Sequence, residues 1–321
     1  MHHTTGKIAD PKRPALHRAH TPHPQKPTRR VSLWLASLLI AAPLSAIAGE
    51  PTAPTKPPLQ DLTLANYFSA GWNEPWTRRS RGEDTPDMSL LRVQTNFLAQ
   101  LFRTDFALQQ NRQENAVRGN DSLSGTVEYA FNRRFMLAAV YNYRWFDSRT
   151  GDDPDGGAAA VFTRLQLFDT ATSSLAMNLR AGFPSHELHE KETTLSFSLA
   201  GWQDLAPLGL KRVGLYYHVQ EETLAGPGAP GSRRNALTYD ISLAKTWTSP
   251  DATLGNATTF IEAYGRTDLD GEQRGHTLVT LTPGVRATLA HRHIIMAGIE
   301  FPVTDQRPFD RILRLTYIYN F

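Results

Sequence analysis

The chain has 321 residues, with 34 Lys and Arg against 31 Asp and Glu, no cysteine and a mean hydropathy of −0.40. The lack of cysteine excludes disulfides and cysteine-ligated metal sites. The first 48 residues hold seven of the basic side chains and one acid, which leaves 27 basic and 30 acidic side chains and a formal charge of −3 for the rest. The basic pI therefore does not indicate nucleic-acid binding, and we expect no nucleic-acid partner.

Residues 1–48 have the pattern of a secretory signal peptide. A basic region ends at Arg29-Arg30, an apolar run covers 33–44, and Ala46 and Ala48 form an A-x-A cleavage motif. A single transmembrane anchor is the alternative, but the run is short and is interrupted by a serine and a proline. The arginine pair also fits a twin-arginine export signal; we favour ordinary export, because barrel proteins cross the inner membrane unfolded.

Residues 49–87 form a second segment without strand periodicity. Residues 49–60 are rich in proline and are expected to be extended in the periplasm. Residues 61–87 place four aromatic side chains among Gly, Pro and Arg, and two positions are open for them. They could plug the mouth of a barrel or dock on its periplasmic rim, and we favour docking. A periplasmic partner of residues 49–87 is a further expectation.

Residues 88–321 alternate apolar and polar side chains in segments separated by turn residues. This pattern predicts an antiparallel transmembrane β-barrel of about twelve strands, with ten to fourteen as the range. Connections of alternating length predict that both termini lie in the periplasm. The predicted strands cover 90–109, 121–131, 133–147, 157–169, 172–184, 192–203, 209–221, 234–248, 256–267, 275–289, 291–302 and 311–321.

The last strand carries a further signal. Leu313, Leu315 and Tyr317 begin an apolar face that continues through Tyr319 and Phe321. The segment resembles the closing strand of a bacterial outer-membrane barrel, although threonine replaces the glycine common at position 316. The resemblance implies that Tyr319 and Phe321 are read by the barrel-assembly machinery, and that the protein resides in the lipid of the outer membrane.

The two faces of the strands have different predicted surroundings. The apolar face, for example Leu237, Tyr239, Ile241 and Leu243, should contact lipid. Aromatic side chains should form two girdles, with Tyr217 in the outer one. The polar face should line the lumen, where arginine outnumbers acid: Arg92, Asn96, Glu128, Asn142, Arg144, Arg164, Arg180, Arg212, His218, Asp240, Glu262, Arg266, Arg286, Glu300 and Arg314.

Two interpretations of this lumen remain open. Ion pairs could fill a closed interior, or unpaired arginines could line a narrow water-filled passage that concentrates anions. Twelve strands lie between the eight that side chains can fill and the sixteen that leave a wide channel, and we favour the passage.

No enzyme is predicted. His218 lacks the nearby serine that a Ser/His hydrolase on such a barrel requires. The histidines and glutamates of 186–190 lack the H-E-x-x-H spacing, and the aspartates of 151–157 lack the later glutamate of a calcium loop. We expect no metal, no cofactor and no catalytic residue, and an outer-membrane hydrolase is the third hypothesis only.

Near the C-terminus the chain reads Ile299-Glu300-Phe301-Pro302-Val303, followed by Arg307-Pro308-Phe309-Asp310. This ending is similar to that of the phenol-degradation (MetA-pathway) outer-membrane family. The resemblance covers about the last forty residues and implies a transporter-like barrel for hydrophobic or aromatic compounds. We therefore expect a channel or transporter for small anionic or aromatic solutes. The alternative is a non-conducting scaffold that binds a partner through the N-terminal segment or the outer loops.

Overall fold

The computed structural model describes residues 59–77, 79, 88–111, 117–148, 156–184, 193–225, 234–248, 255–290, 292–305 and 307–321. The predicted signal peptide with Ala46 and Ala48, and most of the proline-rich segment, lie outside the described residues. Among those residues no helix is long and apolar enough to cross a membrane.

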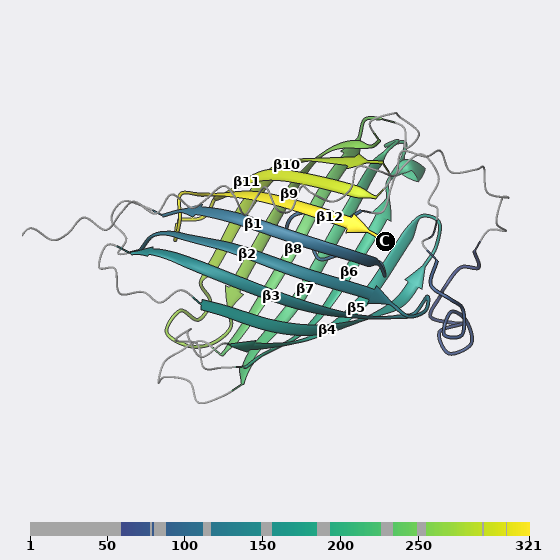
Figure 1. Cartoon of the computed structure of the whole chain (residues 1–321), viewed down its shortest axis with the longest axis horizontal. Helices are drawn as coiled ribbons and strands as arrows, with labels where there is room; N and C mark the ends of the chain where they lie inside the picture. The colour runs from purple at the N-terminus through teal and green to yellow at the C-terminus, as the bar shows by residue number, and fades with distance from the viewer. Residues whose placement is uncertain are drawn as a thin grey trace, which may run out of the picture. The chain divides into compact units, whose positions relative to one another are not determined.

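Twelve strands in the described chain close into one antiparallel barrel (Figure 1). The predicted fold is therefore confirmed. Strand β1 closes the sheet on β12, in register from Leu101 opposite Asn320 to Gln110 opposite Arg311. Closure leaves no strand edge with unpaired backbone groups. The strands are β1 (Gln100–Gln110), β2 (Val117–Ala130), β3 (Phe135–Ser148), β4 (Gly156–Asp169), β5 (Ser173–Pro184), β6 (Thr193–Asp204), β7 (Val213–Ala225), β8 (Asn235–Thr246), β9 (Ala257–Asp268), β10 (Thr277–Leu289), β11 (His293–Pro302) and β12 (Arg311–Asn320).

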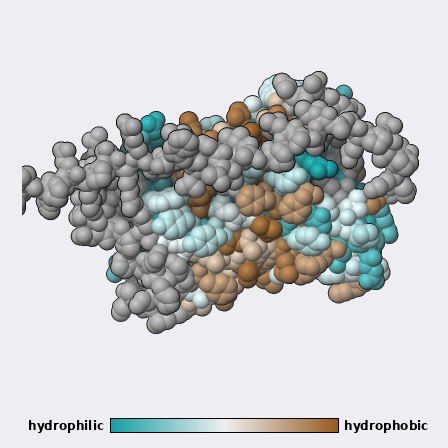
Figure 2. All heavy atoms as spheres, in the orientation of Figure 1, coloured by the Kyte–Doolittle hydropathy of each residue, from teal (hydrophilic) through white to brown (hydrophobic). Residues whose placement is uncertain are grey.

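Alternate side chains on each strand face opposite environments, as the sequence predicts. On β8, Ile241 and Leu243 are 53% and 47% exposed, whereas their neighbours Asp240 and Ser242 are buried at 5% and 1%. Figure 2 shows hydrophobic side chains gathered over the middle of the visible face. On this part of β8 the apolar set thus points away from the barrel and the polar set points into it, the reverse of a strand that covers an apolar core in water.

The two ends of the barrel differ. At one end, here called the turn end, the strands are joined by 131–134, 170–172, 205–212, 247–256 and 290–292. The C-terminus lies at the same end (Figure 1). The other connections form the loop end. The predicted alternation of connection lengths holds only in part, because 205–212 and 247–256 are as long as the connections of the loop end.

One connection at the turn end corrects two predictions. Ala206–Leu208 form a 3₁₀ helix that ends at Gly209, whose φ of 84° favours glycine. Strand β7 therefore begins at Val213, four residues later than predicted. Arg212 was predicted to line the lumen, but it lies in this connection, at a φ of 60°. Its Nη1 donates to the carbonyl oxygen of Trp247 at 3.5 Å, so Arg212 lies on the rim of the barrel at the turn end and not in the lumen.

The shift of β7 also moves Tyr217. We expected it in the girdle at the outer end, but it is the fifth residue of β7 from the turn end. It faces outward and covers Gly201 on β6, its direct cross-strand partner. A β-carbon on Gly201 would lie 2.2 Å from Tyr217 Cζ, so the ring occupies the place of the missing side chain.

Candidate functional site in the barrel interior

Residues 88–99, called the inner segment, lie inside the barrel. The prediction that residues 90–99 begin the first wall strand is wrong, because β1 starts at Gln100. The segment contacts inward-facing side chains of β4, β5, β6, β9 and β11, which lie on different sides of the barrel. Only a segment within the barrel can reach all five strands, and most of its side chains are buried.

Side chains of the barrel wall hydrogen-bond the backbone of the inner segment, which is not part of a strand ladder. Glu262 Oε1 on β9 accepts the backbone N–H groups of Arg92 and Val93, both at 3.0 Å. On β4, Arg164 Nη1 donates to the Phe97 carbonyl oxygen at 2.7 Å, and Gln166 Nε2 donates to that of Asn96 at 3.2 Å. Buried backbone groups need such partners. The polar wall therefore stabilises a defined conformation of the segment.

Side chains of the inner segment add two contacts to this set. Ser198 Oγ on β6 donates to Gln94 Oε1 at 2.7 Å. The Asn96 side-chain amide hydrogen-bonds Ser174 Oγ on β5. Both serines are buried. These contacts tie the middle of the segment to a part of the wall opposite β11.

The turn half of the interior is apolar, which the sequence did not predict. Met88, Leu90, Leu91 and Val93 of the inner segment pack into one buried cluster with wall side chains. The wall contributes Leu101, Trp202, Tyr216, Ala244, Phe260, Ile294, Met296 and Ile318. All of these residues belong to the inward set, so an apolar closure separates the turn end from the rest of the lumen.

The interior charges are largely paired. Arg164 Nη1 lies 3.2 Å from Glu128 Oε2, and Arg314 Nη2 lies 2.5 Å from Glu300 Oε2. Arg103, which is not among the predicted lumen residues, pairs with Asp105 at 2.7 Å. Further inward acids were missed: Asp204, Glu222 and Asp268. The predicted excess of arginine therefore does not follow from the described wall.

The predicted lumen residues divide into three groups. Arg92 and Asn96 lie on the inner segment, and Arg212 lies on the rim. The remaining residues lie on strands, at inward positions: Glu128, Asn142, Arg144, Arg164, Arg180, His218, Asp240, Glu262, Arg266, Arg286, Glu300 and Arg314.

Solvent reaches this wall at the loop half. Arg180 is exposed although Asn178, two residues earlier on the same face of β5, is buried at 2%. Arg144, the tenth residue of β3 from the turn end, and Arg266, the tenth residue of β9 from that end, are partly exposed. Within the described residues, the interior is thus a polar vestibule that solvent reaches on the loop side and a filled core on the turn side.

His218 is oriented by an acid. Its Nδ1 lies 2.7 Å from Asp240 Oδ2 on the neighbouring strand, and both side chains are buried. His218 Nε2 has no hydrogen-bond partner among the described residues. Among the described residues no serine hydrogen-bonds this nitrogen, so the pair lacks the nucleophile of a Ser/His hydrolase within the described wall.

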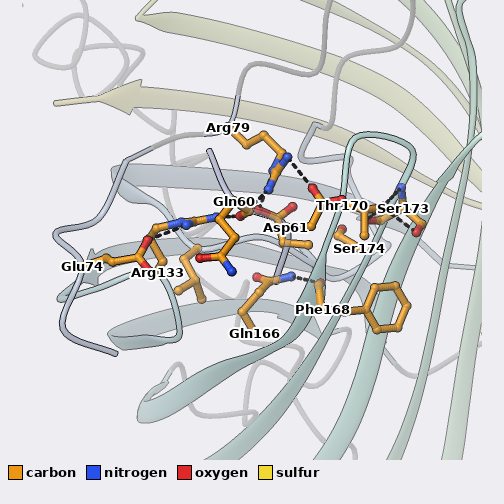
Figure 3. A network of polar contacts seen from close by, with 12 residues as sticks. Gln60, Asp61, Glu74, Arg79, Arg133, Gln166, Phe168, Thr170, Ser173 and Ser174 are labelled. Atoms are coloured by element: carbon orange, nitrogen blue, oxygen red, sulfur yellow. Dashed lines mark hydrogen bonds and ion pairs between the residues drawn. The ribbon is translucent and has the colours of Figure 1, made fainter. Parts of the chain in front are cut away.

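Residues 59–77 and 79, called the rim segment, dock on the turn end. Backbone hydrogen bonds join Leu62 to Asp169, and Pro75 bridges to Asn132. The described part of 61–87 therefore docks on one end of the barrel, as favoured over a plug, and the periplasmic location of that end stays a prediction. Figure 3 shows the polar network that holds it, in which Arg79 lies 2.9 Å from Asp61 and 3.1 Å from Asp169.

Arg134, in the turn between β2 and β3, is the centre of this attachment. It is fully buried, and its guanidinium donates to the carbonyl oxygens of Ala70 at 2.9 Å and Leu167 at 2.8 Å. It also donates to the side chain of Asn66 at 2.9 Å. One guanidinium therefore joins the wall of the barrel to three parts of the rim segment, including Thr63 at 3.2 Å.

Its neighbour Arg133 adds a charged contact, because its Nη1 lies 2.5 Å from Glu74 Oε2. The hydrogen bond from Arg133 holds the pKa of the Glu74 carboxyl below its usual value. The only sequence signal for this site is the Arg133-Arg134 pair in a tight turn.

Tyr319 faces outward and lies 5.2 Å from the His293 ring between centroids, and Phe321 is 52% exposed. Their reading by the assembly machinery stays a prediction. Within the described ranges no group of His, Asp or Glu could hold a metal ion. Residues 186–190 and Asp152, Asp153 and Asp155 lie outside those ranges.

A scan against protein-family models found no match, and a search of curated proteins found no relative. Among solved structures, the chain is similar to a KdgM porin, with a TM-score of 0.45 and 10% identity over 69% of this chain and 99% of the porin. It is also similar to the NanC porin, with a TM-score of 0.47 and 8% identity over 69% and 98%. For LpxR from Salmonella typhimurium the TM-score is 0.40 and the identity is 10%, over 69% of this chain and 100% of LpxR. Similarity at this level carries no inference about function.

Proposed function

We propose that the protein is an outer-membrane channel for small solutes, closed on its turn side by the inner segment in the conformation described. The apolar outward face supports the membrane location, since strands of ten to fourteen residues are long enough to span a bilayer. The turn end, with the rim segment, would face the periplasm. The signal peptide of residues 1–48 would direct export.

The proposal of a channel rests on the difference between the two halves of the barrel interior. On the loop side, the inward wall is polar and accessible to solvent around Arg180. On the turn side, the obstruction includes the inner segment, whose one backbone hydrogen bond to a wall strand among the described residues runs from the Ala130 N–H to the Ala99 carbonyl oxygen at 3.0 Å. Withdrawal of that segment would join the vestibule to the periplasm without breaking any hydrogen bond between wall strands.

The structure suggests a direct test of this channel. The chain has no cysteine, so Asn96→Cys with Ser174→Cys would introduce the only two thiols, at side chains in direct contact. We expect the oxidised variant to carry no single-channel current in planar bilayers and the reduced variant to conduct as the native protein does. Asn96→Cys and Ser174→Cys alone are the controls. A native protein without current above the lipid background would contradict the channel.

The predicted preference for anions rested on an excess of arginine over acid in the lumen, and the described wall does not have that excess. Because Arg103, Arg164 and Arg314 are paired with acids, they do not create an excess of positive charge. We therefore propose a polar passage without a general preference for anions. The aromatic solutes implied by the resemblance of residues 299–310 to the phenol-degradation family remain a prediction.

A non-conducting scaffold is the second candidate. The rim segment exposes Leu64 at 66% and Phe68 at 92% on the side that would face the periplasm. A partner protein could cover these two side chains. Absence of current in every reduced variant, together with a periplasmic partner that is lost on deletion of residues 49–87, would favour this function over the channel.

A further inference from the structure

The part of the wall that faces Arg92 has the composition of a cation site. Arg92 Cζ lies 3.8 Å from the centre of the Tyr264 ring on β9. Its Nε lies 3.9 Å from Glu300 Oε1 on β11. An aromatic face beside carboxylates is the arrangement that recognises guanidinium and ammonium groups.

Two more acids complete this surface. Asp240 on β8 lies directly opposite Tyr264 in the sheet, and Glu262 precedes Tyr264 by two residues on the same face. Glu262 and Asp240 are 0% and 5% exposed. The wall around Arg92 therefore presents three carboxylates, of which Glu300 is shared with Arg314 and Asp240 with His218.

Arg92 does not donate hydrogen bonds to all the acceptor atoms of this surface. Glu262 Oε2 and Asp240 Oδ1 are buried and accept no hydrogen bond from any residue that the structure describes. Arg92 Nε is likewise without a hydrogen-bond partner in the described part of the chain. Charge and the Tyr264 ring thus hold the guanidinium in place, while two buried acceptors remain available. Buried acceptors of this kind normally have partners, and a ligand with more donors in place of the Arg92 side chain would supply them.

We propose that Tyr264, Glu300, Glu262 and Asp240 form a binding site for small solutes that carry a guanidinium or ammonium group. Arg92 occupies the site as a tethered competitor. This proposal rests on the proposed channel function and specifies its solute. A bound cation displaces the Arg92 side chain, which removes one anchor of the inner segment and shifts the population toward the open channel.

Binding of methylguanidinium to the purified full chain, measured by titration calorimetry, tests the site. We expect Arg92→Ala to bind methylguanidinium at least about ten-fold more tightly than the native protein, because the tethered competitor has an effective concentration in the millimolar range. Adding Tyr264→Leu to Arg92→Ala should abolish that binding. Arg311→Ala, which removes an exposed arginine at the loop end of β12, is the matched control and should bind as the native protein does. Equal affinities of the native and Arg92→Ala proteins, or binding of acetate in place of methylguanidinium, would overturn the proposal.

A second measurement does not depend on the Arg92 variant. Saturating methylguanidinium should speed chymotrypsin cleavage at Leu90, Leu91 or Phe97 of the native chain several-fold, and Tyr264→Leu should remove this effect. Unchanged cleavage of the native chain would overturn the proposal.

Bilayer recordings separate this site from the channel. Binding of methylguanidinium without current in any variant would contradict the channel and retain the site. Current that methylguanidinium does not raise, in a protein that fails to bind it, would contradict the site and retain the channel.

Discussion

Leu91 of the inner segment packs against Gly298 of β11, where no side chain stands in its way. A β-carbon at position 298 would lie 2.5 Å from Leu91 Cδ1 and 3.0 Å from the carbonyl oxygen of Pro283. Gly298→Ala should therefore weaken the seating of the inner segment by about 1–3 kcal/mol, the usual cost of overpacking. Faster chymotrypsin cleavage between residues 88 and 99 measures this change.

Two further variants test whether the contact between Leu91 and the new methyl group at position 298 causes the faster cleavage. Leu91→Ala added to Gly298→Ala should restore part of the protection, because it removes the atom that the new methyl group meets. Gly125→Ala is the matched control, since its β-carbon would meet no atom within 4 Å. Equal loss of protection in the Gly125 and Gly298 variants would show that the contact with Leu91 is not the cause.

Arg134→Met should release the rim segment and leave the barrel folded. The change removes a buried guanidinium and leaves the carbonyl oxygens of Ala70 and Leu167 without a donor, at a cost of about 3 kcal/mol or more. Hydrogen exchange at residues 62–75 should rise, while exchange in β8 should not. Arg311→Met, which removes an exposed arginine bonded to Gln110, should change neither. Unchanged exchange in the rim segment of Arg134→Met would contradict the role of this side chain.

Acid should loosen the same attachment. The pKa of Glu74 is lowered by Arg133, so the docked state favours the carboxylate. This contribution is fully present above the usual glutamate pKa of 4.5 and is lost as the pH falls through the lowered value. Proteolytic protection of the rim segment should fall as the pH is lowered from 4.5, and Glu74→Gln should weaken the protection at pH 7 and flatten its pH dependence. Because Glu74 is partly exposed, the effect should be small.

The fold could be predicted because apolar and polar side chains alternate along the wall strands with a period of two residues. Ile241 and Asp240 show the rule: adjacent side chains meet opposite surroundings, and the alternation is visible in the letters. The same period misled at residues 90–99, since an extended segment inside a barrel alternates as a wall strand does. At 205–212 the alternating Leu208 and Leu210 concealed a turn that Gly209 makes possible.

The candidate site was less predictable because it depends on register. Arg164 and Glu128 could be assigned to the lumen, but their pairing follows from the alignment of β2, β3 and β4. Asp105 and Glu222 were missed because the predicted bounds of their strands were displaced or ambiguous. The apolar closure was missed for a different reason: inward residues such as Trp202 and Phe260 were expected to be polar in a water-filled lumen.

The membrane location itself rests on which side chains meet lipid. Ile241 is near the middle of β8 and is 53% exposed, whereas Gln220 on the adjacent strand β7 faces the interior. Arginine at a lipid-facing position near the bilayer midplane costs about 2–4 kcal/mol, and arginine on the lumen face does not. We therefore expect Ile241→Arg to lower the free energy of unfolding by that amount and Gln220→Arg to change it little. Urea unfolding in lipid vesicles, followed by tryptophan fluorescence, measures both. If the two variants lose the same stability, Ile241 does not face lipid, and the interior and exterior of the barrel have been assigned to the wrong solvents.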